Sequence, residues 1–218
     1  MELLAVLTII AVGAAISVPA ISGAQKRAAN TTCLSRMRAL GSGILLYATD
    51  QAGAMPRSFH SAGSFSVPHW PVTIAPYLGI SAEAGTPEWE AAFQKYFRCP
   101  ADKRTDSTIF SYALNVHYEL DPDGDDYVGS PARWRTLGSI SRPAKSILLA
   151  ESRPIPYGDH LMCHQWSTVN AARNALDATR HGKTSNYLFA DGHAESLPVE
   201  ATFNPGAGIN LWNPSLAK

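Results

Sequence analysis

The sequence predicts an α+β fold in which one long N-terminal helix packs on an antiparallel sheet, and three stretches support this prediction. Residues 3–50 keep a helical spacing of apolar side chains. Residues 145–152, KSILLAES, form a short apolar run typical of a buried strand. Residues 186–197 read as two strands around Asp191-Gly192, a turn that hairpins favour. We expect a long helix over residues 1–52 and one globular domain over 53–218.

The first half of the predicted helix is apolar on all sides. Leu3–Ile21 contains no charged residue, and the first charge after Glu2 is Lys26. At 1.5 Å per residue this stretch is roughly 28 Å long, which matches the hydrocarbon thickness of a bilayer. A cleaved signal peptide is the alternative, but it would have a basic start and a shorter apolar core. We therefore expect one membrane span over residues 3–21, kinked at Pro19, which lacks a backbone donor.

The second half of this helix is predicted to be amphipathic. Its apolar residues recur at spacings of four and three, which places them on one face. They are Cys33, Met37, Leu40, Ile44 and Tyr47. A helix of this kind has two roles: the first half lies in lipid or against copies of itself, and the second half docks on the globular domain.

The segment after the long helix is predicted from its turn and cap residues. Residues 53–71 are rich in Gly, Ser and Pro, which indicates a loop, and residues 71–79 read as a short helix or an irregular segment. A clearer helix follows, with Thr86 as N-cap and Pro87 at the first helical position. Its aromatic side chains recur at four-residue spacing, as core residues do. They are Trp89, Phe93 and Phe97.

Two motifs identify a family resemblance. Residues 1–22, MELLAVLTIIAVGAAISVPAIS, together with the tract over residues 31–56, resemble the N-terminus of type IV pilins and type II secretion pseudopilins. His181, followed after nine residues by Asp191-Gly192, is similar to the H-x9-DG motif associated with prepilin-type processing proteins. Smaller similarities occur in the family's order at FRCPAD, SYALN and RPAKSILLAES.

The resemblance implies a pilin-like fold and a structural role without catalysis. The chain would be a subunit of a type IV pilus-like or type II secretion filament. It would sit in the inner membrane as a single-pass protein, with its C-terminal domain in the periplasm or in an extracellular filament. Its partners would be other pilin or pseudopilin subunits, which it would contact through the N-terminal helix.

Glu2 matches the glutamate at the start of the family's mature helix, which acts in assembly, and Pro19 matches the family's helix-kinking proline. In the family a basic leader ending in Gly, and then Phe-Thr-Leu, precede that glutamate, and prepilin peptidase removes the leader. Here only Met1 stands before Glu2. Either a leader lies upstream of Met1 or this copy is not processed. We expect the leader, because cations beyond the span without a basic leader before it would retain the domain in the cytoplasm.

Composition bears on the possible partners, and the cysteine count bears on a possible disulfide. Lys plus Arg and Asp plus Glu are equal at 18 each, so no global field favours nucleic acid as a partner. The chain has three cysteines: Cys33, Cys99 and Cys163. Related sequences also tend to have cysteine at the first two positions, so the resemblance makes Cys33–Cys99 the candidate disulfide. The alternative is a pair of buried thiols lying side by side.

Two stretches carry metal hypotheses, although no cofactor is expected. The acidic loop offers a weak calcium site through four carboxylates, Asp121, Asp123, Asp125 and Asp126. Its glycine, Gly124, comes fourth in the loop and not sixth as in an EF-hand, so a solvated turn is the preferred interpretation. Residues 159–164, DHLMCH, could gather zinc ligands if they were helical, but they lack a distant partner.

The H-x9-DG motif has a structural and a functional interpretation. In the first, Asp191 and Gly192 form the hairpin turn, and His181 stands where the first strand begins. In the second, His181, Asp191 and His193 form a metal or acid–base site of a membrane-anchored exported enzyme or binding domain. No nucleophile elbow, phosphate loop or complete metal signature accompanies these residues. We therefore expect no enzyme.

Overall fold

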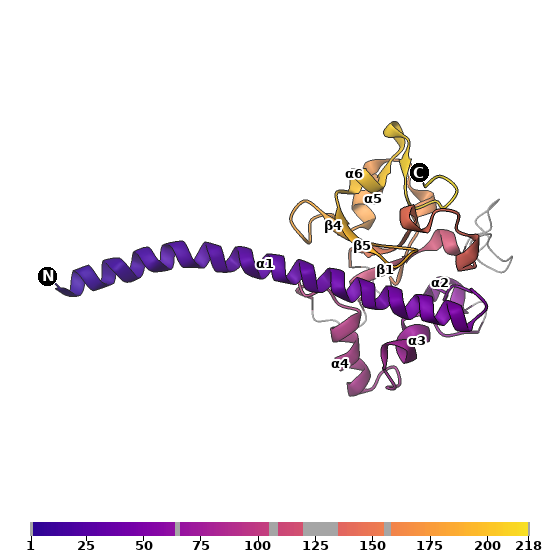
Figure 1. The fold of residues 1–218 in the computed structure, drawn as a ribbon, viewed down its shortest axis with the longest axis horizontal. Coiled ribbons are helices and arrows are strands. Elements are labelled where there is room, and N and C mark those ends of the chain that lie inside the picture. The colour runs from indigo at the N-terminus through magenta and orange to yellow at the C-terminus, as the bar shows by residue number, and fades with distance from the viewer. Residues whose placement is uncertain (1, 64–65, 105–108, 120–134, 155–157, 218) are drawn as a thin grey trace.

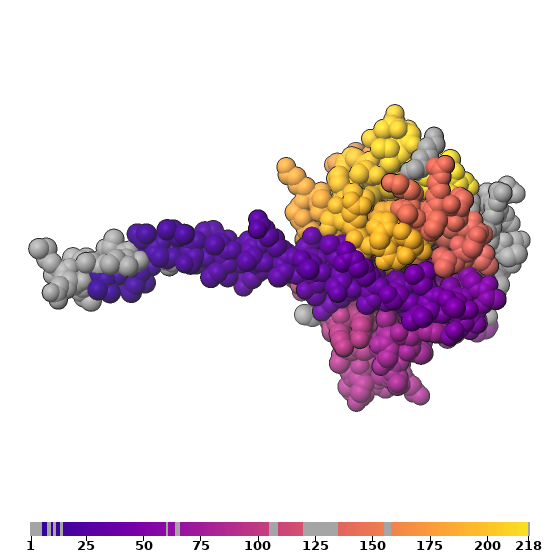
Figure 2. All heavy atoms as spheres, in the orientation of Figure 1, coloured from indigo at the N-terminus to yellow at the C-terminus, as the bar shows by residue number. Residues whose placement is uncertain are grey.

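The computed structural model describes residues 2–63, 66–104, 109–119, 135–154 and 158–217. One helix, α1 (Glu2–Asp50), runs along the whole molecule and continues through Pro19. Its N-terminal half projects from the globular part, and its C-terminal half lies against the rest of the chain (Figures 1 and 2). Within the residues that the structure describes, no helix combines the length and apolar character needed to cross a bilayer.

The docked half of α1 buries the face that the sequence predicts. Cys33, Met37, Leu40 and Ile44 are fully buried, and Tyr47 packs at the edge of the same core. Gly41 allows the close approach to the sheet, because a methyl group there would stand 2.8 Å from Cδ1 of Leu188. The predicted amphipathic face is therefore confirmed as the docking face.

The sheet has five strands in the order β3-β1-β2-β4-β5. Their bounds are β1 (Tyr112–Asn115), β2 (Ile147–Glu151), β3 (His160–Leu161), β4 (Ser185–Phe189) and β5 (Ala194–Leu197). Neighbouring strands pair antiparallel, except that β1 and β3 are parallel. The predicted α+β class and long helix are confirmed, and the predicted antiparallel sheet is corrected at this one pair.

The sheet separates two hydrophobic cores. One face, with Tyr112, Leu114 and Leu188, packs against α1 and the helices beyond it. The other face, with Tyr187 and Phe189, packs against the C-terminal segments. Consecutive residues of β4 point to opposite faces, as pleating requires, so every residue of this strand is buried.

Helices on the far side of α1 complete the first core (Figure 1). They are α3 (Trp70–Ile74), η2 (Ala75–Leu78) and α4 (Pro87–Tyr96). The short helix α2 (Phe59–Ala62) lies instead beside Glu119 and Asp159, which accept hydrogen bonds from the Ser61 hydroxyl and the Phe59 N–H. Thr86 caps α4 by accepting a hydrogen bond from Trp89 N at 3.2 Å, and Trp89, Phe93 and Phe97 are buried, as predicted. The predicted loop over 53–71 is wrong in part, because α2 forms within it and α3 begins at Trp70.

The remaining elements are short. The helices are α5 (Val169–Ala175) and α6 (Val199–Thr202), and the strands are β6 (Phe203–Asn204) and β7 (Ile209–Asn210). Of these, α5, α6 and β6 pack on the second core. Single 3-10 turns occur at η3 (Val116–Tyr118), η4 (Leu137–Ser139), η5 (Pro143–Lys145), η6 (Cys163–Gln165) and η7 (Pro205–Ala207). Trp212 is the large residue at the centre of this layer, where it meets Trp166 and Tyr187 edge-to-face.

A buried histidine in η3 should make stability fall in mild acid. Burial, assisted by the nearby His164, lowers the pKa of His117 to about 4. The unfolded chain takes up a proton at this position below about pH 6.5, whereas the folded chain does so only near pH 4. The free energy of unfolding should therefore fall by roughly 3 kcal/mol as pH drops from 6.5 to 4.

Urea unfolding at several pH values, followed by circular dichroism, measures this slope. His117→Gln has no proton to bind at this position. The unaltered protein should therefore lose stability relative to His117→Gln as pH falls. A difference in unfolding free energy between the two proteins that does not change between pH 6.5 and pH 4 would contradict the prediction.

Candidate functional site

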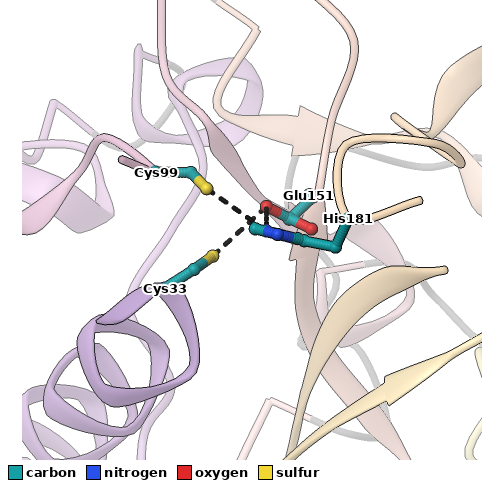
Figure 3. Close-up of side chains that lie close together, drawn as sticks. All are labelled: Cys33, Cys99, Glu151 and His181. Atoms are coloured by element: carbon teal, nitrogen blue, oxygen red, sulfur yellow. Dashed lines mark hydrogen bonds and ion pairs between the residues drawn. The ribbon is translucent and has the colours of Figure 1, made fainter. Parts of the chain in front are cut away.

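Four side chains from four distant segments converge at the point where α1 enters the domain. They are Cys33 of α1, Cys99 after α4, Glu151 at the end of β2 and His181 before β4 (Figure 3). One sulfur, nitrogen or oxygen atom of each lies within 4.8 Å of those of the others. We call this group the Cys-His-Glu cluster.

Local structure explains why these side chains meet. Cys33 lies on the docking face of α1, and Glu151 ends a strand whose residues are all buried. His181 stands in the turn before β4, which Gly182 completes with a φ of 90°. Cys33 and Glu151 are fully buried, Cys99 is 2% exposed, and the His181 side chain is 3% exposed.

Short contacts join all members of the cluster. Nε2 of His181 lies 3.1 Å from Oε1 of Glu151 and 3.3 Å from Sγ of Cys99. The Cys33 thiol donates to the same Glu151 oxygen at 3.2 Å and lies 3.2 Å from the hydroxyl of Tyr112. The other oxygen of Glu151 accepts from the backbone N–H of Asn186 at 2.8 Å. Glu151 is thus the centre of the cluster.

The surroundings shift the pKa values of Cys99 and His181 in opposite directions. The adjacent Cys33 side chain lowers the pKa of Cys99 to about 6, with burial opposing this shift and His181 assisting it. Burial lowers the pKa of His181, but its bonds to Cys99 and Glu151 prevail and raise it to about 9. Burial raises the pKa of Cys33. The surroundings thus favour the charged forms of Cys99 and His181 and the neutral form of Cys33.

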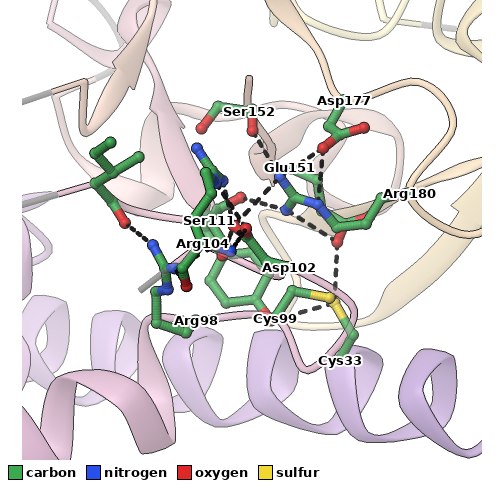
Figure 4. Close-up of polar contacts among 12 residues, drawn as sticks. Cys33, Arg98, Cys99, Asp102, Arg104, Ser111, Glu151, Ser152, Asp177 and Arg180 are labelled. Atoms are coloured by element: carbon green, nitrogen blue, oxygen red, sulfur yellow. Dashed lines mark hydrogen bonds and ion pairs between the residues drawn. The ribbon is translucent and has the colours of Figure 1, made fainter. Parts of the chain in front are cut away.

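An arginine connects the cluster to a wider set of buried charges (Figure 4). Arg180 lies 3.3 Å from Oε1 of Glu151, 2.8 Å from Oδ2 of Asp177 and 3.7 Å from Oδ2 of Asp102. Its two terminal nitrogens also donate to the carbonyls of Ser111 and Ser152. Burial disfavours charge on Arg180, yet the three carboxylates outweigh it and raise the pKa of this guanidinium.

A groove of about 710 Å³ opens beside the cluster, between α1 and the domain. It is lined by Lys26, Arg27 and Asn30 of α1 and by Pro100, Ala101 and His181 of the domain, among others. His181 borders this groove, whereas the other three members of the cluster do not line it.

The H-x9-DG residues are divided between two places. Asp191 and Gly192 form the predicted turn of the β4–β5 hairpin, where Gly192 has a φ of 91°. His193 bonds Asp191 at 2.6 Å and stacks on Phe189. His181 lies at the opposite end of β4, and a five-residue strand spans about 16 Å. The structure thus supports the turn and does not bring His181 together with Asp191 and His193.

The other candidate sites have separate outcomes. Cys33 and Cys99 lie side by side as free thiols, so the structure contains the alternative to the candidate disulfide. The calcium candidates Asp121, Asp123, Asp125 and Asp126 lie outside the described residues. Residues 159–164 do not form an α-helix, because β3 and the start of η6 occupy them, and Asp159 and Cys163 have other partners. Asp159 binds His69, His160 and the backbone of Phe59, while Cys163 donates to Asn115 at 2.8 Å.

Sequence reasoning missed the cluster as a unit, and above all the role of Glu151. A signal was present, because Glu151 is the charged residue inside the apolar stretch 146–152 and a buried carboxylate needs a partner. His181 and the cysteines had each been singled out for other reasons. What brings them together is the tertiary packing of four segments.

Comparisons with known proteins do not extend these observations. No family model matches the sequence, and no curated protein and no solved structure is significantly similar to it. A proposal for the function of this chain therefore depends on its own residues and their arrangement.

Proposed function

We propose that this protein is a pilin-like, non-catalytic subunit of a type IV pilus-like or type II secretion filament, assembled through α1. One observation carries the proposal: the projecting half of α1 exposes large apolar side chains that the domain does not cover. Those described are between 52% and 69% exposed, and they are Val6, Leu7, Ile10, Val12, Ile16, Val18 and Ile21.

Covering these side chains would contribute a large favourable free energy. Burying one Val, Leu or Ile side chain contributes about 1.5 to 3 kcal/mol, so the set represents on the order of 10 kcal/mol. Apolar area of this size marks a surface that meets lipid or another protein. Before assembly the bilayer of the inner membrane would cover it, and in a filament the same helices of neighbouring copies would replace the lipid.

The docked half of α1 supports this role in a different way. This half is buried between the sheet and the helices α3 and α4. Because α1 is one continuous helix, the projecting half continues directly from this buried segment. Packing of projecting helices would hold each globular domain at the outside of the assembly. By resemblance, prepilin peptidase would first remove an upstream leader, and Glu2 would then pair with the N-terminal amine of a neighbouring copy.

Cysteine crosslinking tests this assembly directly. The double variant Ile10→Cys/Ile21→Cys, made in the full chain and expressed in its host, can join each copy to two neighbours. Oxidation of intact membranes or sheared filaments should then give a ladder of oligomers. Thr49→Cys/Asp50→Cys is the matched control at the exposed end of the docked half and should give no ladder.

Adding Glu2→Ala to the double variant should remove the ladder while the protein remains in the membrane fraction, because a carboxylate in an apolar bundle requires a partner. Equal ladders with and without Glu2 would refute the role of Glu2. Monomers alone in the double variant would refute the filament and favour an anchored monomer.

A further inference from the structure

We propose that the Cys-His-Glu cluster is a structural zinc site in which Cys33, Cys99, Glu151 and His181 are the four ligands of one Zn²⁺ ion. This inference goes beyond the filament role and does not depend on it. It also departs from the expectation of no cofactor.

The geometry of the four ligand atoms fits a tetrahedral ion. Zinc bonds of about 2.0 to 2.3 Å place the ligand atoms of a tetrahedral site about 3.3 to 3.8 Å apart. In the cluster Glu151 Oε1 lies 3.1 Å from His181 Nε2 and 3.2 Å from Cys33 Sγ. Cys99 Sγ lies 3.3 Å from His181 Nε2, and all pairs are within 4.8 Å. Adjustments of about 1 Å or less, within the reach of side-chain rotation, would complete the site.

The ligand types select the metal. Two sulfurs and an imidazole suit zinc, which is borderline soft, whereas calcium and magnesium require oxygen ligands. Four protein ligands leave no position for a substrate, and the cluster is almost fully buried. A closed site of this kind is structural and not catalytic.

Neighbouring groups support the ligands as an outer shell should. Asn186 N–H holds Oε2 of Glu151, which leaves Oε1 directed at the cluster, and the Tyr112 hydroxyl lies beside Cys33 Sγ. Two thiolates, one carboxylate and Zn²⁺ would carry a net charge of −1. Arg180, 3.3 Å from Oε1 of Glu151, supplies the compensating positive charge.

A disulfide between Cys33 and Cys99 is the competing use of the same sulfurs. It would need the sulfurs at about 2.05 Å, and it would give no role to the histidine and the carboxylate that meet them. Zinc uses all four side chains, and the groove that His181 borders lies beside the site. The ion would join α1, the segment after α4, β2 and the turn before β4.

The test begins with the unaltered full chain, purified with a reductant in detergent. Elemental analysis should find one zinc per chain, and replacement by Co²⁺ should give the visible d–d bands of a tetrahedral ion and sulfur-to-cobalt charge transfer. Cys99→Ser should lose the charge-transfer intensity of one sulfur and bind Co²⁺ more weakly. Cys163→Ser removes an equally buried cysteine and should leave the spectrum unchanged.

The outcomes separate the alternatives. The proposal would be overturned if the unaltered chain is folded, shows three reactive thiols after denaturation, and binds neither zinc nor cobalt. A Cys33–Cys99 disulfide found by peptide mapping of protein from its host, without zinc, would overturn it in favour of the disulfide. Both measurements use the unaltered chain, so they stand even if Cys99→Ser fails to fold. Neither depends on oligomer ladders, so the filament proposal can fail separately.

Discussion

Replacing Arg180 by methionine should lower the free energy of unfolding by about 3 to 5 kcal/mol. The Arg180 side chain is 3% exposed and is the shared partner of Glu151, Asp102 and Asp177. Methionine fills a similar volume but removes the counter-charge that the three carboxylates share, and two of them, Glu151 and Asp102, are buried. An uncompensated buried charge costs far more than the lost hydrogen bonds alone.

Urea unfolding at neutral pH measures this loss, and Arg173→Met provides a matched control. Arg173 pairs with Glu200, but the two side chains are 51% and 37% exposed. A surface pair contributes about 0 to 1 kcal/mol, so the control should change stability little. Equal effects of the two substitutions would show that burial of the Arg180 network has no energetic consequence.

Leu40→Ala should lower the free energy of unfolding by about 2 to 5 kcal/mol. Leu40 is fully buried in the first core, between the sheet and the helices on the far side of α1. Truncation removes apolar contact and leaves a cavity that close-packed neighbours fill only in part. This position therefore tests whether the docked half of α1 is part of the domain core.

The comparison with Ile16→Ala makes the test specific. Ile16 lies on the same helix but is 69% exposed, so its truncation should change the stability of the domain by less than about 0.5 kcal/mol. Unfolding of both variants in one detergent, followed by the fluorescence of the buried Trp70 and Trp212, gives the two values. A large effect of Ile16→Ala on the isolated subunit would contradict the division of α1 into two halves.

The elements that sequence analysis predicted correctly are those with local signals. A repeat of apolar residues at helical spacing defines the docking face from Cys33 to Ile44, and a glycine that must adopt positive φ marks the turn at Gly192. The cap at Thr86 is a contact between residues three positions apart, so it too can be read from the chain.

The features that were missed depend on distant partners. β1 is a four-residue strand buried on both faces, so it shows no alternation, and its parallel neighbour β3 has only two residues. α2 forms inside a Ser-rich and Gly-rich stretch, where Glu119 accepts hydrogen bonds from the hydroxyls of Ser58 and Ser61. The Cys-His-Glu cluster likewise joins residues up to 148 positions apart, from Cys33 to His181, and no local pattern connects them.

The position of Cys33 along α1 has a mechanical consequence. Among the side chains of α1 that the structure describes, Cys33 is the first to be fully buried as the helix enters the domain. A pulling force along the projecting half therefore reaches the contacts around Cys33 before it reaches Met37, Leu40 or Ile44. A metal bond at Cys33 would place the strongest link at the point where the tension is greatest.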